Sequence, residues 1–115
     1  MGYVNQIWQG DANASLARSF PLCESPARVI NLTGAEILSV RKLAEQLGEI
    51  MGVAPVLEGT ECETALLGDA TECRKVFGPP AVPPATILAW VAHWVKHEGK
   101  TLNKPTKYES RTGAF

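Results

Sequence analysis

The predicted fold rests on residues 28–57, which read RVINLTGAEILSVRKLAEQLGEIMGVAPVL. Apolar residues recur at helical spacing from Val40 to Met51, Ser39 can cap the start of this helix, and Gly52 can end it. The apolar run Arg28–Leu32 indicates a strand covered on both faces, and residues 55–57 indicate another strand. A strand, a helix and a strand in this order predict a parallel, right-handed crossover.

Further elements are predicted on either side of this stretch. Residues 3–8 mix aromatic and β-branched side chains, which is typical of a strand, and Asp11 is expected to cap a helix over residues 12–20. Asp69 is expected to cap a third helix that stops at Gly78, and Pro83-Pro84 to open a fourth. The fourth helix has the richest apolar stripe, formed by Ile87, Leu88, Trp90, Val91, Trp94 and Val95. The predicted fold class is α/β (α+β), with about four helices and two or three short, mostly parallel strands.

Composition narrows the classes of function. The chain has 115 residues, 45% of them hydrophobic, and a formal net charge of −1, which is typical of one globular domain and gives no reason to expect nucleic-acid or membrane binding. No apolar run is long enough to span a membrane, and the first residues lack a signal-peptide pattern. Three cysteines at irregular spacing do not suggest a disulfide framework. We therefore expect a cytoplasmic protein.

Charge is uneven along the chain. Residues 58–72 hold five acidic side chains and no basic one, whereas residues 96–115 hold five basic and two acidic ones. We divide the chain into an α/β domain of residues 1–98 and a basic C-terminal tail of residues 99–115. The tail is either a solvated segment or a segment that covers a pocket and binds an anionic group.

Motifs for chemistry are sparse. No glycine-rich phosphate-binding loop is recognisable, so no cofactor is expected on this chain, and no nucleophile with its base can be assembled, so no catalytic residue is assigned. His93 and His97 have the spacing of two metal ligands on one helix face, but no third ligand can be named, and two exposed or half-exposed histidines without a metal are the favoured interpretation. Trp90 and Trp94 are expected in the core, which leaves Trp8 as the tryptophan favoured to face a ligand.

Five segments, taken together, resemble the C-terminal part of the NAD-dependent epimerase/dehydratases, the extended short-chain dehydrogenase/reductases. They are Trp8-Gln-Gly-Asp11 before a helix, Val29-Ile-Asn-Leu-Thr-Gly34, Leu38-Ser-Val-Arg-Lys-Leu-Ala44, Asp69-Ala-Thr-Glu-Cys-Arg-Lys-Val-Phe-Gly78 and Lys104-Pro-Thr-Lys-Tyr108. Their order and spacing are more specific than any one of them, and the resemblance runs from about Val4 to Phe115.

The resemblance implies that substrate binding and catalysis belong to different parts of the parent enzyme. Family members carry a Rossmann domain with a glycine-rich loop and a Tyr-x-x-x-Lys catalytic pair, whereas Tyr3 and Tyr108 here are followed four residues later by Ile7 and Thr112. The chain therefore resembles the substrate-binding C-terminal portion of an oxidoreductase, not catalytic by itself, and NAD(P) is implied only for a full-length parent enzyme. In the family, the segment matching residues 31–34 completes the edge of the cofactor-domain sheet.

The same resemblance suggests where a substrate binds. A small, carbohydrate-like molecule is expected, and the assigned substrate-binding residues are Trp8, Asp11, Asn31, Thr33, Lys104 and Lys107. Many family members that act on sugar nucleotides have an Arg-x-x-Asp motif before the third helix, but residues 60–67 here are acidic, which argues against a nucleotide-sugar substrate. The alternative function is a stand-alone small binding or protein-interaction module without cofactor.

Self-association is also expected. A strand at residues 29–32 whose sheet neighbours are missing has unpaired backbone groups, and such an edge pairs readily with another chain. The apolar stripe of residues 87–95 adds surface that a partner would cover. These two features predict a homodimer.

Overall fold

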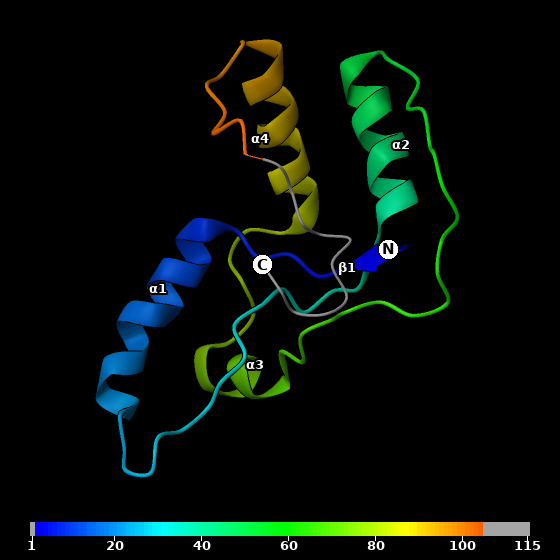
Figure 1. Ribbon diagram of the computed structural model, residues 1–115. Helices are drawn as coiled ribbons and strands as arrows, with labels where there is room; N and C mark the ends of the chain where they lie inside the picture. The colour runs from blue at the N-terminus through cyan, green and yellow to red at the C-terminus, as the bar shows by residue number, and fades with distance from the viewer. Residues whose placement is uncertain (1, 105–115) are drawn as a thin grey trace.

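The computed structural model describes residues 2–104, which form a mixed α+β fold (Figure 1). The elements are β1 Tyr3–Val4, α1 Gln9–Ser19, the 3-10 helix η1 Phe20–Leu22, β2 Leu38–Ser39, α2 Val40–Met51, α3 Thr71–Phe77 and α4 Pro84–Lys96. The predicted α+β class with about four helices is confirmed. No helix among these residues has the length and apolar character needed to cross a membrane.

The sheet differs from the prediction. β1 and β2 pair antiparallel, with Tyr3 opposite Ser39 and Val4 opposite Leu38, so the expected mostly parallel arrangement is wrong. The Val40 amide extends the pairing by donating to the Gly2 carbonyl over 3.0 Å. This short ladder fixes the N-terminal segment against the start of α2.

The predicted crossover of residues 28–57 is also wrong, because neither of its strands forms. Residues 28–32 and 55–57 lie in irregular segments, and Val29 and Val56 are each 83% exposed. A short apolar run shows a preference for burial but does not supply the neighbouring strand that a ladder needs. Within residues 2–104 the only ladder is the one between β1 and β2.

The helix α2 forms where it was predicted, because its signals are local. The Ser39 side chain accepts a hydrogen bond from the Lys42 amide at 3.3 Å, which caps the first turn. At the other end Gly52 adopts a left-handed conformation with φ of 73°, and its amide donates to the Gly48 carbonyl.

Helices α2 and α4 stand side by side and run in the same direction, with their C-terminal ends together (Figure 1). The Lys96 ammonium group donates to the Ile50 carbonyl oxygen over 2.6 Å. Because helix C-termini carry partial negative charge, a lysine between two of them is favourable.

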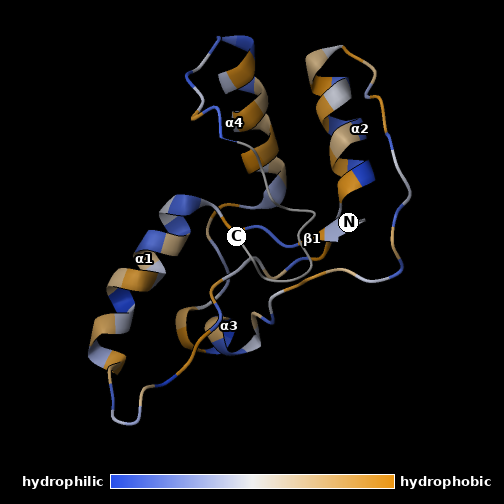
Figure 2. Ribbon diagram, in the orientation of Figure 1, coloured by the Kyte–Doolittle hydropathy of each residue, from blue (hydrophilic) through white to orange (hydrophobic). Residues whose placement is uncertain are grey.

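The core is thin. Ala70, Cys73 and Ala92 are the buried hydrophobic residues of the described chain. Trp90 and Trp94 were expected in the core, but they are 47% and 54% exposed, and apolar colour extends over much of α4 in Figure 2. Helix α1 likewise buries no residue completely.

Candidate functional site

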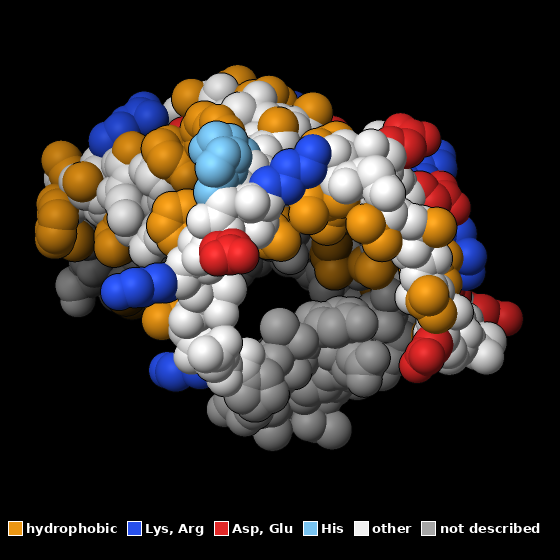
Figure 3. All heavy atoms as spheres, turned by 90° about the horizontal axis from the view of Figure 1, so that it is seen from above, with side chains coloured by type: hydrophobic (Ala, Val, Ile, Leu, Met, Phe, Trp, Pro, Cys, Tyr) orange, Lys and Arg blue, Asp and Glu red, His pale blue; other side chains and the backbone are white. Residues whose placement is uncertain are grey.

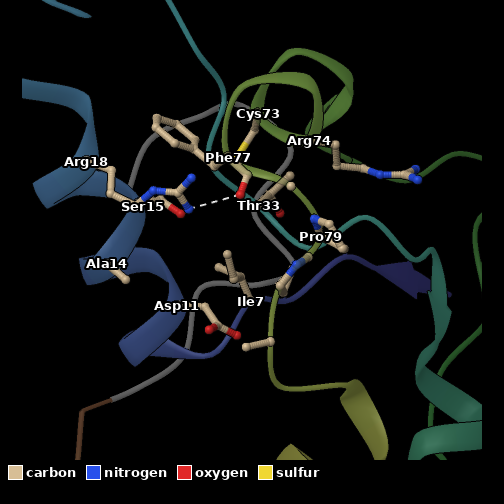
Figure 4. Close-up of a pocket in the computed structure, with 13 residues that line it drawn as sticks. Ile7, Asp11, Ala14, Ser15, Arg18, Thr33, Cys73, Arg74, Phe77 and Pro79 are labelled. Atoms are coloured by element: carbon tan, nitrogen blue, oxygen red, sulfur yellow. Dashed lines mark hydrogen bonds between the residues drawn. The ribbon is translucent and has the colours of Figure 1, made fainter. Parts of the chain in front are cut away.

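A cleft lies between α1 and the turn that follows α3 (Figure 4). Its first part has a volume of about 190 Å³, and a second part of about 280 Å³ shares Arg74, Pro79 and Pro80 with it. The polar side chains that line the first part are Asp11, Ser15, Arg18, Thr33 and Arg74. The second part reaches the turn at Gly34 and Glu36. We call these two parts together the cleft.

Asp11 holds the start of α1 against the segment that leads into α4. It was predicted as the cap of α1, but the helix begins at Gln9, and the capping position is held by Trp8, whose side chain makes no capping hydrogen bond. Asp11 lies in the first turn, where a negative charge is stabilised by the helix dipole. Its carboxylate accepts a hydrogen bond from the Val82 amide at 2.9 Å, and it lines the cleft.

Asn5 builds the wall behind the cleft. Its side-chain amide donates to the carbonyl oxygens of Gly34 and Gly68 over 3.2 and 2.6 Å, and its side-chain oxygen accepts from the Gly68 amide at 3.3 Å. The Thr33 hydroxyl donates to the Asn5 carbonyl oxygen over 3.3 Å. One asparagine thus joins three segments that are far apart in the sequence and positions Thr33 at the cleft.

Gly34 is needed for close packing at this wall. A Cβ atom at position 34 would run into the carbonyl oxygen of Gln6, which belongs to the backbone and cannot rotate away. Glycine at position 34 therefore allows the two chain segments to pack in contact.

Two arginines reach the cleft from different helices. Arg18 of α1 donates to the Phe77 carbonyl oxygen over 2.9 Å, and its guanidinium carbon lies 5.4 Å from the centre of the Phe77 ring. Arg74 of α3 is exposed, and its side chain extends away from α1 in Figure 4. Within the described chain no hydrogen bond or ion pair engages the Arg74 guanidinium.

Cys73 and Asp69, on and just before α3, both have shifted pKa values. Burial raises the pKa of the Cys73 thiol, which lines the cleft in its protonated form. Asp69 was predicted to cap α3, but the capping position is Ala70, one residue later. Asp69 still accepts a hydrogen bond from the Thr71 amide at 2.9 Å, and hydrogen bonds from Thr71 lower the pKa of Asp69. Asp11 and Glu36 give the cleft two carboxyl groups opposite its two guanidinium groups.

The two histidines lie away from the cleft, on α4 and at its end. Their ring centres are 4.1 Å apart, and Nδ1 of His97 lies 2.8 Å from the His93 carbonyl oxygen. In residues 2–104, no three side chains of the His, Cys, Asp or Glu type gather as a metal site would require. The cleft residues can hydrogen-bond and pair with charge, which suits binding and orientation of a ligand.

The structure brings two of the predicted substrate-binding residues together, Asp11 and Thr33. Trp8 packs edge-on against Trp90 with ring centres 5.4 Å apart, outside the lining of the cleft. Asn31 and Lys104 are exposed and do not line it either. Lys107 lies outside the described residues.

Sequence reasoning missed Asn5, Arg18 and Arg74. Asparagine is uncommon in strands, so Asn5 in an apolar segment was a usable signal. The two arginines gave no local signal, because their common position depends on how α1 packs against α3.

No protein-family model, curated protein or solved structure matches this chain. The function is therefore inferred from the cleft and from the sequence motifs.

Proposed function

We propose that this chain is the substrate-binding C-terminal portion of an NAD-dependent epimerase/dehydratase-like oxidoreductase, not catalytic by itself. One observation carries the proposal: three of the motifs that resemble this family meet at the cleft. Asp11 comes from the motif of residues 8–11, Thr33 and Gly34 from residues 29–34, and Arg74 from residues 69–78. Residues separated by as many as 63 positions, as Asp11 and Arg74 are, are expected to converge in this way if they share a ligand.

The cleft residues have roles in binding. The Asp11 carboxylate accepts hydrogen bonds, and the Thr33 hydroxyl both donates and accepts, so both suit the hydroxyl groups of a carbohydrate-like substrate. The apolar walls formed by Ile7 and Phe77 fit the less polar faces of such a molecule. These residues would orient the substrate toward a reacting group held elsewhere.

The residues of this chain do not fit the NAD(P) cofactor. A dinucleotide pyrophosphate needs a glycine-rich turn whose amides stay open at a helix N-terminus. Gly34 is the glycine nearest to such a position, and it is occupied by packing against the Gln6 carbonyl. In the proposed enzyme, the cofactor and its hydride chemistry belong to a separate Rossmann domain.

Two further features support the proposal. Leu32 is exposed and lies in the segment of residues 31–34 that, in the family, completes the edge of the cofactor-domain sheet. Cys23, Cys62 and Cys73 are all free, which agrees with the proposed cytoplasmic, reducing location.

The DNA upstream of codon 1 tests the proposal. We expect an in-frame segment that encodes a glycine-rich loop and a Tyr-x-x-x-Lys pair. The polypeptide with that segment should bind NAD(H), and this chain alone should give no heat in isothermal titration with micromolar NAD(H). An upstream region without such a segment, or cofactor binding by this chain alone, would overturn the proposal and favour a stand-alone binding module.

A further inference from the structure

We propose that Arg74 recognises the single oxyanion, carboxylate or phosphate, of a monosaccharide-sized ligand in the cleft. This inference rests on the proposed substrate-binding function and names the substrate class, a sugar acid or sugar phosphate.

Arg74 differs from the other arginines of the described chain. Arg28 pairs with Glu72 at 3.7 Å, Arg41 pairs with Glu61 at 2.8 Å, and Arg18 donates to a backbone carbonyl. Arg74 alone among these four has no partner for its guanidinium group. A guanidinium group presents planar donors that match a carboxylate or a phosphate, so a free one at a cleft is suited to bind an oxyanion.

The position of Arg74 supports a role in recognition. It lines both parts of the cleft, and its side chain extends away from α1, so the guanidinium group is available to a ligand on the side of the second part (Figure 4). Helix α3 carries it, and the end of this helix is held to α1 through the bond from Arg18 to the Phe77 carbonyl. The side chain therefore projects from a fixed element.

The size of the cleft limits the ligand. A ligand confined to one part of the cleft has a space of about 190 or 280 Å³, which is below the roughly 300–1,000 Å³ of sites for drug-sized molecules. A monosaccharide suits this space better than a nucleotide sugar does.

The charges of the cleft limit the ligand further. Asp11 gives the first part a carboxyl group, Glu36 gives one to the second part, and Arg74 lines both parts. Two carboxylates disfavour a ligand with several negative charges, whereas one anionic group can pair with Arg74. A sugar with one acidic group therefore suits the cleft better than a ligand with several.

Titration of the full chain followed by NMR, with glucuronate, glucose 6-phosphate, glucose and inorganic phosphate as probes, tests the inference. Glucuronate, glucose 6-phosphate or both should shift the amide signals of Thr33 and Arg74, and their relative affinity identifies the preferred oxyanion. Glucose and inorganic phosphate should bind at least about tenfold more weakly, because each lacks one half of the recognised group. Equal binding of glucose, equal binding of phosphate, or no binding of either acidic sugar would overturn the inference.

Variants assign the effect to Arg74. Arg74→Gln should weaken binding of the acidic sugar about tenfold or more, and Arg74→Lys should recover only part of it, because lysine keeps the charge and loses the planar pair of donors. Arg41→Gln is the matched control, since Arg41 lies outside the cleft and should not affect binding. Unchanged binding by Arg74→Gln would overturn the inference, even if the upstream DNA encoded a Rossmann domain. Arg74-dependent binding without such a domain would overturn only the proposed enzyme family.

Discussion

At the scale of single residues, Gly34 and Gly52 each require glycine, for different physical reasons. Gly34 has a backbone neighbour where its Cβ would lie, whereas Gly52 has open space but a positive φ. Gly52→Ala should cost about 1 kcal/mol of unfolding free energy, as expected for a left-handed helix end. Gly34→Ala should cost more, because the Gln6 carbonyl must move and β1 with it. Urea unfolding of both variants checks this order, and equal losses would contradict the close packing at Gly34.

Cysteine reactivity provides a second residue-scale prediction. Burial raises the pKa of the Cys73 thiol, whereas Cys23 and Cys62 are exposed. Since the thiolate is the reactive form, Cys73 should react more slowly with a thiol reagent near neutral pH and should gain reactivity only above the usual thiol range. Variants that retain one cysteine each, followed with a chromogenic disulfide, measure the three rates. Labelling of Cys73 at the rate of Cys23 would show that α3 is open to solvent.

Part of the site was predictable at this scale. Asp11 and Thr33 were assigned from motifs and do lie together in the cleft. Asn5 and Arg74 were not assigned, because their roles depend on contacts with residues remote in the sequence. Asn31, assigned from the same motif as Thr33, lies outside the cleft lining, which shows that a motif does not specify which of its side chains turns inward.

At the scale of elements, the sequence predicted those whose signals lie within the element itself. It did not predict those that depend on a partner remote in the sequence. Helix α2 has its cap, its apolar repeat and its terminal glycine within the same fourteen residues, and it forms as expected. The strands of residues 28–32 and 55–57 were inferred from apolar content alone, and a strand also requires a neighbour. The observed ladder instead pairs Val4 with Leu38.

The cap of α2 supports a prediction about this helix. Ser39→Ala removes the acceptor for the Lys42 amide, and we expect a loss of about 1 kcal/mol of stability. Ser39→Asp restores an acceptor and should recover most of the loss. Urea unfolding followed by circular dichroism measures both variants, and an unaffected Ser39→Ala variant would show that the cap contributes nothing.

At the scale of the whole molecule, the chain exposes more surface than its mass requires. Its accessible surface is 8886 Å², whereas a compact monomer of 12.4 kDa exposes about 6,100 Å². Its radius of gyration is 16.2 Å, against about 13 Å for a compact domain of this length. The composition is typical of one globular domain, but composition does not reveal whether apolar faces meet within one chain.

The outer face of α4 is one example of an apolar face left uncovered. It consists of Trp90, Val91, Trp94 and Val95, which are 45–54% exposed. Figure 3 looks down on this end of the molecule and shows hydrophobic side chains gathered beside the two histidines. A helix that is apolar on most sides is normally buried, so this face is expected to have a partner.

We predict that the chain by itself forms a homodimer through this outer face of α4. A standard interface takes about 800 Å² from each partner, and the four half-exposed apolar residues of this face would lie at its centre. A two-fold axis lets the same face serve both copies.

Sedimentation equilibrium over roughly 10–100 µM should therefore give the mass of a dimer, in the range where interfaces of this size commonly associate. Val91→Glu places a charge on the face and should give a monomer, whereas Ala89→Glu, an exposed position on another side of α4, should leave the dimer intact. A monomeric mass for the unmodified chain at all concentrations would contradict the prediction, because the face would then stay exposed without a second copy to cover it.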